Sequence, residues 1–463
     1  MHYISTRGYG PATFMDTLFH GLAPDGGLYM PAQYPQFSRD FMDELTYLSY
    51  EDIAEKIMSP FVDGEIPQDV FSKMIRQAYK SFDDIEITPL LHYDQDLWVL
   101  ELFHGPTMAF KDIALQLVGE IMSWALADAE KKVTMIGATS GDTGPAAIDG
   151  LKNVENANIF MLFPHNRVSQ LQRVQMTTAN KENVFPIAID GTFDDCQALV
   201  KQMFNDEIFR GHVRATAVNS LAWPRLMPQM VYYFFAWSRL KEMVGNKPLT
   251  FSVPTGNFGN VFAGYLAMQC GLPLNRLLIA SNTNDILSRF INEADYSVHG
   301  VTATRSPSMD IQIASNFERL LFDIFARKTE RVQEVMACLK ETGKLPPLTD
   351  MEMDEVRSVF AAEGVSEIDT LKMISEADAT KNIVLDPHSA VGLSAILKHD
   401  ELKPAVSLAT AHPVKFASAV TEATGKLPLY EDEIDDMMKA EETFEVLPND
   451  IEAVQNYIMD NIV

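Results

Sequence analysis

One lysine in the segment ELFHGPTMAFKDIALQ (101–116) has the surroundings of a nucleophilic amine. Lys111 follows a turn of small residues and stands directly after Phe110, where a helix is predicted to begin. An aromatic neighbour that excludes water lowers the pKa of a lysine, and the unprotonated amine can then form an imine with a carbonyl compound. The segment therefore predicts a catalytic lysine. A solvated lysine at a helix start is the alternative for this segment taken alone.

A first glycine-rich turn follows in KVTMIGATSGDTGPAAIDGL (132–151). The apolar run 133–136 predicts a strand, and a helix-like run follows the Gly/Ser/Thr loop. Such a loop points backbone N–H groups and hydroxyls at one place, and the helix N-terminus adds partial positive charge. We therefore expect it to bind an anion such as a carboxylate. Its polar residues are Thr139, Ser140, Asp142 and Thr143.

A second turn of this kind lies in LTFSVPTGNFGNVFAGYLA (249–267). The run 249–253 predicts a strand, and a helix is expected from Val261. Glycines at both ends of the loop let the main chain approach a phosphate closely. A purely structural turn is the alternative for this segment alone. The loop consists of Gly256, Asn257, Phe258, Gly259 and Asn260.

Together, the lysine and the two turns resemble the fold-type II family of pyridoxal 5'-phosphate (PLP) enzymes, and within it the threonine synthases most closely. The similar segments are spread along nearly the whole chain: STRG (5–8), DGGLYMP (25–31), FHGPTMAFKD (103–112), ATSGDTGPAA (138–147), PTGNFGN (254–260), DPHSAVG (386–392) and ATAHPVKF (409–416). The resemblance implies an α/β fold with two parallel-sheet αβα domains and the active site between them. It also implies a mainly helical N-terminal domain and a helical insertion.

The resemblance also implies roles for individual residues. Lys111 would hold PLP as an imine and later move protons at the substrate carbons. The turn 256–260 would cradle the cofactor phosphate, and Thr410 would offer a neutral hydroxyl to the pyridine nitrogen. The substrate carboxylate would face Thr139, Ser140, Asp142 and Thr143. Many relatives carry Asn at the position of Asp142, and a carboxylate there repels the substrate unless it pairs with a protonated group or accepts from loop N–H groups.

The reaction implied by the resemblance converts O-phosphohomoserine and water to threonine and inorganic phosphate, the last step of threonine biosynthesis. It requires a base near two substrate carbons and a cationic pocket for the leaving phosphate. Asn219 and Arg225 match the phosphate-binding segment of the family, and the guanidinium fork suits phosphate geometry. Arg167 and Arg173 are further candidates, with solvated surface arginines as the equal alternative. No spacing of His, Cys, Asp and Glu predicts a catalytic metal.

Three other functions stay open. A dehydratase of hydroxyamino acids or a β-replacement enzyme would use the same lysine and phosphate turn without an arginine pocket. A nucleotide-binding Rossmann protein would place a pyrophosphate at 256–260, but that turn lacks the G-x-G-x-x-G pattern. A non-catalytic relative would bind amino-acid phosphates or a partner without turnover.

Composition excludes several classes of protein. The chain has 463 residues, enough for two or three domains, and its 47% hydrophobic and 22% charged content is ordinary for a soluble enzyme. A net charge of -27 disfavours binding to nucleic acid and to anionic membranes. Cys196, Cys270 and Cys338 are few and widely spaced, which indicates reduced thiols. We expect a cytoplasmic enzyme with a small-molecule substrate, either a monomer or a dimer.

The elements that must position these residues alternate along the chain. Helix-length segments separate many of the strand candidates, which is typical of parallel sheets covered on both faces. The candidates are 97–102, 133–137, 159–163, 184–189, 215–218, 250–253, 277–280 and 405–409. We expect a mainly helical domain at 1–95, a smaller α/β domain with the lysine at 96–210, and a larger α/β domain at 211–463. The last would contain a helical insertion at about 316–377.

Overall fold

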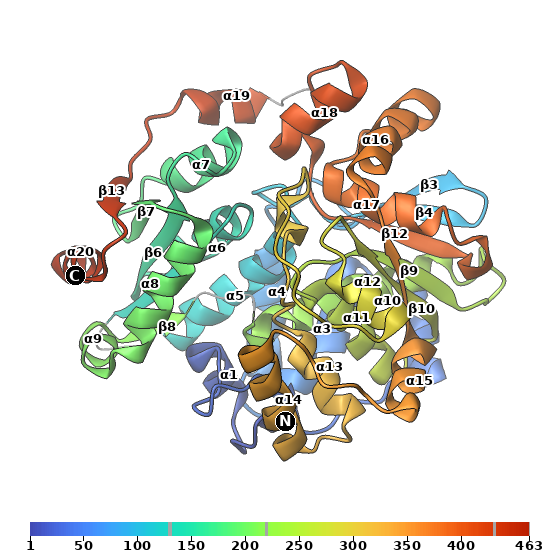
Figure 1. Cartoon of the computed structure of the whole chain (residues 1–463), viewed down its shortest axis with the longest axis horizontal. Helices are drawn as coiled ribbons and strands as arrows, with labels where there is room; N and C mark the ends of the chain where they lie inside the picture. The colour runs from blue at the N-terminus through green and yellow to red at the C-terminus, as the bar shows by residue number, and fades with distance from the viewer. Residues whose placement is uncertain (128–131, 218–220, 429–431, 463) are drawn as a thin grey trace.

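The computed structural model describes residues 1–127, 132–217, 221–428 and 432–462, and it contains two sheets of mainly parallel strands (Figure 1). A sheet of six strands has the order β11-β10-β9-β12-β4-β3, and a sheet of five has the order β13-β7-β6-β5-β8. Only β3 runs antiparallel to its neighbour within these two sheets as described. The predicted α/β class is confirmed.

The strands of the six-stranded sheet are β3 (Leu90–Asp94), β4 (Leu97–Glu101), β9 (Leu249–Pro254), β10 (Leu274–Ser281), β11 (Phe360–Gly364) and β12 (Ala405–Ala409). Those of the five-stranded sheet are β5 (Val133–Ala138), β6 (Ala157–Pro164), β7 (Val184–Asp190), β8 (Ala215–Ala217) and β13 (Glu445–Pro448). An antiparallel ribbon near the N-terminus pairs β1 (Tyr3–Ser5) with β2 (Tyr29–Pro31).

The α-helices are α1 (Phe14–His20), α2 (Arg39–Glu44), α3 (Tyr50–Val62), α4 (Gln68–Tyr79), α5 (Lys111–Ala125), α6 (Thr143–Leu151), α7 (Gln170–Thr177), α8 (Phe193–Asn205), α9 (Glu207–Val213), α10 (Met227–Leu240), α11 (Gly259–Gln269), α12 (Ile286–Glu293), α13 (Phe317–Ile324), α14 (Thr329–Thr342), α15 (Asp350–Val359), α16 (Glu367–Lys381), α17 (Pro387–Ile396), α18 (Ala417–Thr424), α19 (Asp432–Lys439) and α20 (Ile451–Asn461). Two of the short 3-10 helices adjoin functional candidates: η2 (Trp223–Arg225) and η5 (Pro413–Phe416).

Capping residues in the sequence explain where several of these helices begin. Ser169 accepts from the N–H of Gln172, whose side chain in turn accepts from the N–H of Ser169, so a capping box starts α7. Asp386 caps α17 and is followed by a proline in the first turn, a position that needs no N–H donor. Caps of this kind fix the direction of the loops that lead into the helices.

Two glycines let α5 and α6 pack closely. A Cβ added at Gly119 would lie 1.8 Å from the carbonyl oxygen of Gly150, so only glycine permits the helices to approach this far. Since α5 begins at Lys111 and α6 begins directly after Asp142, this contact fixes the distance between the two predicted site segments.

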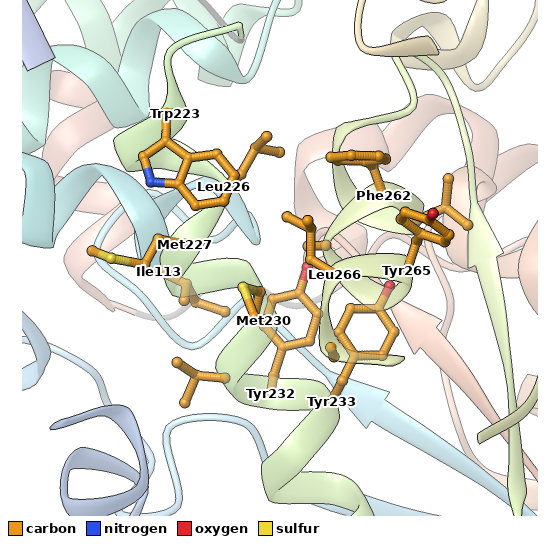
Figure 2. Packing of buried hydrophobic residues seen from close by; sticks show 14 of the residues in the cluster. Ile113, Trp223, Leu226, Met227, Met230, Tyr232, Tyr233, Phe262, Tyr265 and Leu266 are labelled. Carbon is orange, nitrogen blue, oxygen red and sulfur yellow. The ribbon is translucent and has the colours of Figure 1, made fainter. Parts of the chain in front are cut away.

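A large hydrophobic core packs around α11, the helix that begins in the second glycine turn (Figure 2). It is formed by side chains of α10 and α11 with additional residues such as Ile113 and Trp223. The hydroxyls of Tyr232 and Tyr233 donate to the side-chain oxygen of Asn260 at 2.6 and 2.9 Å. The core therefore holds the end of the predicted phosphate turn in place.

The strands of the two sheets are interleaved along the chain. Strand β4 belongs to the six-stranded sheet, although it lies at the start of the segment 96–210 that we expect to form the smaller α/β domain. Strand β13, near the C-terminus, belongs to the five-stranded sheet because it pairs in parallel with β7. The chain thus passes from one sheet to the other more than once, and Lys111 lies on the passage from β4 to β5.

The segment expected as a helical insertion also contains a strand. Residues 316–377 do contain α13, α14, α15 and the greater part of α16, but they also contain β11, which pairs in parallel with β10. The segment therefore supplies an edge strand of the six-stranded sheet. No helix within the described ranges is both long enough and apolar enough to cross a membrane.

Candidate active site

The side chain of Lys111 is enclosed at the start of α5. It is 13% exposed, and its Nζ lies 4.8 Å from the centre of the Phe110 ring. Burial lowers the pKa of the amine, and although Asp142 opposes this effect, the charges of Lys415 and Arg225 reinforce it. The structure thus places Lys111 in the desolvated setting that a nucleophilic amine needs.

Asp142 lies between two ammonium groups. One carboxylate oxygen lies 3.7 Å from Nζ of Lys111 and the other lies 3.2 Å from Nζ of Lys415, while Gln172 donates at 2.8 Å. Burial by itself raises the pKa of the Asp142 carboxyl, but Lys415, Lys111, His388 and Gln172 together hold it well below its usual range. Asp142 is therefore ionised and paired with protonated groups. A carboxylate paired in this way does not repel a substrate carboxylate.

The loop around Asp142 keeps its shape through Thr139. The Thr139 hydroxyl donates to the carbonyl oxygen of Gly141 at 2.9 Å and accepts from the N–H groups of Gly141 and Gly144. Because this hydroxyl is used within the turn, Thr139 shapes the loop. Ser140 is exposed and Thr143 is half-buried, so these two hydroxyls are better placed to reach a ligand.

The second turn is built closely around its backbone. A Cβ at Gly256 would lie 2.3 Å from the carbonyl oxygen of Ser308, so the position requires glycine. Phe258 has a φ of 65°, and Gly259 begins α11 directly after it. The Asn257 carbonyl accepts from the N–H and the side-chain amide of Asn316 at 3.1 and 3.0 Å.

Free donors at this turn suit a phosphate. The Nδ2 of Asn260 is buried and has no partner among the residues that the structure describes. Backbone N–H groups at the start of α11 carry partial positive charge. The residues 256–260 therefore fit the phosphate of a cofactor.

Thr410 directly follows β12 and is hydrogen-bonded to the residue before Lys111. Its carbonyl oxygen accepts from the N–H of Phe110 at 2.9 Å, and Ala109 and Ala411 form an isolated antiparallel bridge. Its own N–H donates to the hydroxyl of Ser389 at 3.0 Å. The structure thus brings the predicted ring-nitrogen partner and the predicted catalytic lysine together.

Arg225 carries a buried positive charge close to this group. The residue is 6% exposed, and its Nε and Nη1 atoms have no partner within the described ranges. Burial lowers the pKa of the guanidinium to about 10, so it stays protonated near neutral pH. An unpaired buried cation is costly unless an anion binds to it. Asn219, its predicted companion, lies outside the described residues.

The two other candidate arginines have different surroundings. Arg173 binds Glu442 with two hydrogen bonds of 2.8 and 2.9 Å and so connects α7 to the C-terminal segment. Arg167 is exposed, and its charge lowers the pKa of Asp195, an effect secondary to the hydrogen bonds from Thr192. Neither residue shows the unpaired, buried state of Arg225.

Both Lys415 and Gln172 contact Asp142, although neither has a role predicted from the sequence. Lys415 belongs to the segment ATAHPVKF, five residues after Thr410 and just past the end of a strand. Residues beyond the carboxyl ends of parallel strands commonly line sites, and that signal was available. Gln172 offered only its place in a capping box.

Comparisons with known proteins agree with this geometry. The sequence matches the family profiles "Threonine synthase N terminus" over residues 2–79, "Pyridoxal-phosphate dependent enzyme" over 82–338 and "Threonine synthase, C-terminal" over 389–458. Threonine synthase from Pseudomonas aeruginosa is 45% identical, with 99% of this chain and 98% of that protein covered. Threonine synthase from Saccharomyces cerevisiae is 40% identical, with 94% and 91% covered.

Solved structures give the same result. The crystal structure of PLP-bound threonine synthase from Brucella melitensis superposes with a TM-score of 0.96 at 44% identity, and covers 100% of this chain and 99% of that one. Threonine synthase from Escherichia coli gives a TM-score of 0.84 at 30% identity, with 99% and 100% covered. The chain belongs to the threonine synthases, within the PLP-dependent enzymes.

Proposed function

We propose that this chain is a carbon–oxygen lyase that releases phosphate from O-phosphohomoserine and adds water to form threonine. The observation that carries the proposal is the buried guanidinium of Arg225, which lies close to Lys111 and whose Nε and Nη1 have no partner among the residues that the structure describes. The turn 256–260 supplies one set of anion donors, and Arg225 supplies a second. A PLP enzyme whose substrate also carries a phosphate needs two such places.

Four features of the structure fit PLP. Lys111 offers an enclosed amine, and the turn 256–260 offers a helix start and the free amide donor of Asn260. Gly256 leaves room that a Cβ would fill, and Thr410 lies beside the lysine segment. When bound, PLP withdraws electrons from the substrate carbons and so makes their protons acidic.

The side chains of the protein carry out the remaining steps, which are proton transfer and substrate binding. The amine of Lys111 takes a proton from the α carbon of the substrate and exchanges protons at the neighbouring carbon. Ser140 and Thr143 bind the substrate carboxylate, and the neutralised Asp142 does not repel it. Arg225 binds the phosphate and stabilises the charge that grows on it as the carbon–oxygen bond breaks.

The other activities use fewer of these groups. Family membership rules out the nucleotide-binding Rossmann alternative. A dehydratase or a β-replacement enzyme has no substrate phosphate that would call for the buried Arg225. Arg225 therefore supports the phosphate-releasing reaction over its neighbours in the fold-type II family.

The test uses the full chain reconstituted with PLP. We expect phosphate and threonine to appear in equal amounts from O-phosphohomoserine, without ammonia release from serine or threonine. Ammonia release without phosphate release would favour a dehydratase. PLP binding without turnover of any of these substrates would favour the non-catalytic relative.

A further inference from the structure

Lys415 is the most enclosed cation of the site. It lies in η5, and its side chain is 0% exposed. Its Nζ contacts three acceptors: the carbonyl oxygen of Thr107 at 2.6 Å, Oε1 of Gln175 at 3.1 Å and the carboxylate of Asp142 at 3.2 Å. Because an ammonium group has three donors, these contacts replace its water completely. The three acceptors therefore hold the Lys415 ammonium group in one place inside the protein.

The Asp142 carboxylate is shared between Lys415 and Lys111. Both ammonium groups lie within 4.0 Å of it, on different oxygens. One carboxylate cannot neutralise two cations, so the group carries an excess positive charge, to which Arg225 adds. This excess opposes protonation of Lys111, the less completely bound of the two lysines.

Lys415 also connects the two sheets of the fold. It follows β12 of the six-stranded sheet, whereas Asp142 precedes α6 and Gln175 lies in α7, on the side of the five-stranded sheet. Val414, the residue before Lys415, packs with Leu171 of α7. Packing and charge together hold Lys415 at the boundary between the six-stranded and the five-stranded sheet.

We propose that Lys415 is a positioning residue of the reaction, whose fixed charge keeps Asp142 ionised and neutralised so that the Lys111 amine stays available to take a proton. Two consequences follow. Asp142 does not need Lys111 as its counter-ion when that amine acts on carbon, and it does not repel the substrate carboxylate. The catalytic consequence rests on the proposed function, but the coupling among the three side chains does not.

Other charged groups face this cluster and stay in place in the test. Arg225 lowers the pKa of Lys111, and His388 lowers the pKa of Asp142. The charge of Lys415 in turn lowers the pKa of Asp112. None of them changes in the variants below, so a difference between the variants reports on Lys415 and Asp142.

The test measures the reactivity of Lys111 in the full chain without added cofactor. Trace acetylation between about pH 6 and about pH 10, with mass spectrometry of the peptide that contains Lys111, gives the pH midpoint of its amine. In Lys415→Met the midpoint should rise by about one pH unit, which lowers reactivity about tenfold below the midpoint. An unchanged midpoint in a folded Lys415→Met protein would overturn the proposal.

Lys241→Met is the matched control. Lys241 is also a largely buried lysine, 7% exposed in its side chain and 2.7 Å from Asp43, but it lies in a different contact network. Its replacement should leave the Lys111 midpoint in place. An equal rise in both variants would mean that loss of any buried lysine disturbs the site, and it would also overturn the proposal.

If circular dichroism shows that Lys415→Met does not fold, Asp142→Asn tests the proposed coupling instead. This variant keeps both lysines and removes the anion between them, so the Lys111 midpoint should fall. A midpoint that stays in place contradicts the proposed coupling. A shifted midpoint, together with a wild-type chain that releases no phosphate from O-phosphohomoserine, would leave the coupling supported and the proposed function wrong.

Discussion

The backbone N–H of Phe110 donates to the carbonyl oxygen of Thr410 at 2.9 Å. This hydrogen bond joins the start of α5 to the end of β12, two segments about 300 residues apart in the chain. The residue before Lys111 and the residue proposed to face the cofactor ring are thus held as one unit. Catalytic geometry here depends on the loop that follows β12 as much as on the helix that begins at Lys111.

Replacing Lys111 by alanine should abolish phosphate release. The substitution removes the proposed base and the amine that would bind PLP, and we expect kcat to fall by at least about 10³-fold. The fold should persist, because the Lys111 side chain lines the site and does not belong to the hydrophobic core. Reductive trapping with borohydride should label the wild-type chain at Lys111 and leave the variant unlabelled. An adduct on another lysine contradicts the assignment.

Replacing Arg225 by methionine should lower the activity without lowering the thermal stability. Loss of the charged hydrogen bonds to phosphate should lower kcat/KM for O-phosphohomoserine by about 10- to 100-fold. The thermal midpoint should stay the same or rise, because two nitrogens of the buried Arg225 guanidinium lack a partner within the described part of the chain.

Arg173→Met is the control for Arg225. Its guanidinium is bound to Glu442, so kcat/KM should change by less than about twofold. If Arg173→Met lost as much activity as Arg225→Met, the substrate phosphate would have to be placed elsewhere.

Replacing Gly256 by alanine should weaken cofactor binding. The new Cβ would lie 2.3 Å from the Ser308 carbonyl, and relief of that overlap requires the turn to move. Strain of this size corresponds to roughly a 10- to 100-fold loss of PLP affinity, measurable by absorbance titration. Gly364→Ala adds the same methyl group where nothing lies within 4 Å. Equal affinity in both variants would show that 256–260 does not hold the cofactor.

Asp112 should make stability depend on pH. Its carboxylate accepts from the N–H and the hydroxyl of Thr107 at 2.8 and 2.6 Å, but burial outweighs these bonds and raises its pKa to about 6. Because the folded state holds this proton more tightly than the unfolded state, its contribution to stability is fully present below about pH 4. That contribution is lost as the pH rises through about 6, and it amounts to at most about 3 kcal/mol.

The variant Asp112→Asn does not ionise and so lacks this dependence. The thermal midpoint of the wild-type chain should therefore fall relative to that of Asp112→Asn between about pH 4 and about pH 7. A difference between the two midpoints that stays constant over this range would mean that Asp112 titrates normally.

The interior strands of both sheets could be predicted from the sequence, whereas three edge strands could not. Strands β4, β5, β6, β7, β9, β10 and β12 coincide with predicted apolar runs. So does the edge strand β8, whose predicted segment 215–218 ends at Val218, outside the described residues. The missed strands β3, β11 and β13 all lie at an edge of a sheet, where one side has no neighbouring strand. Sequences such as LLHYD, FAAEG and EVLP are short and partly polar, so periodicity does not distinguish them from loops.

The candidate site was predictable where a residue type carried its own signal. Lys111 beside Phe110, and glycines between strand and helix, show their chemistry within a few positions. The shared role of Lys415 and Asp142 depends on their contact with each other, and the two residues lie more than 250 positions apart in the sequence. No local pattern contains the information that a buried lysine will meet a particular carboxylate.

The pairing of β13 with β7 affects how the protein folds during its synthesis on the ribosome. Residues 133–217 are translated well before β13, the strand that borders them, and before α20, the helix that packs on α8. Until residues 445–461 have been made, this part of the nascent chain has an open strand edge of the kind that invites aggregation. Chaperone dependence should therefore concentrate in the interval between the synthesis of β7 and the synthesis of β13.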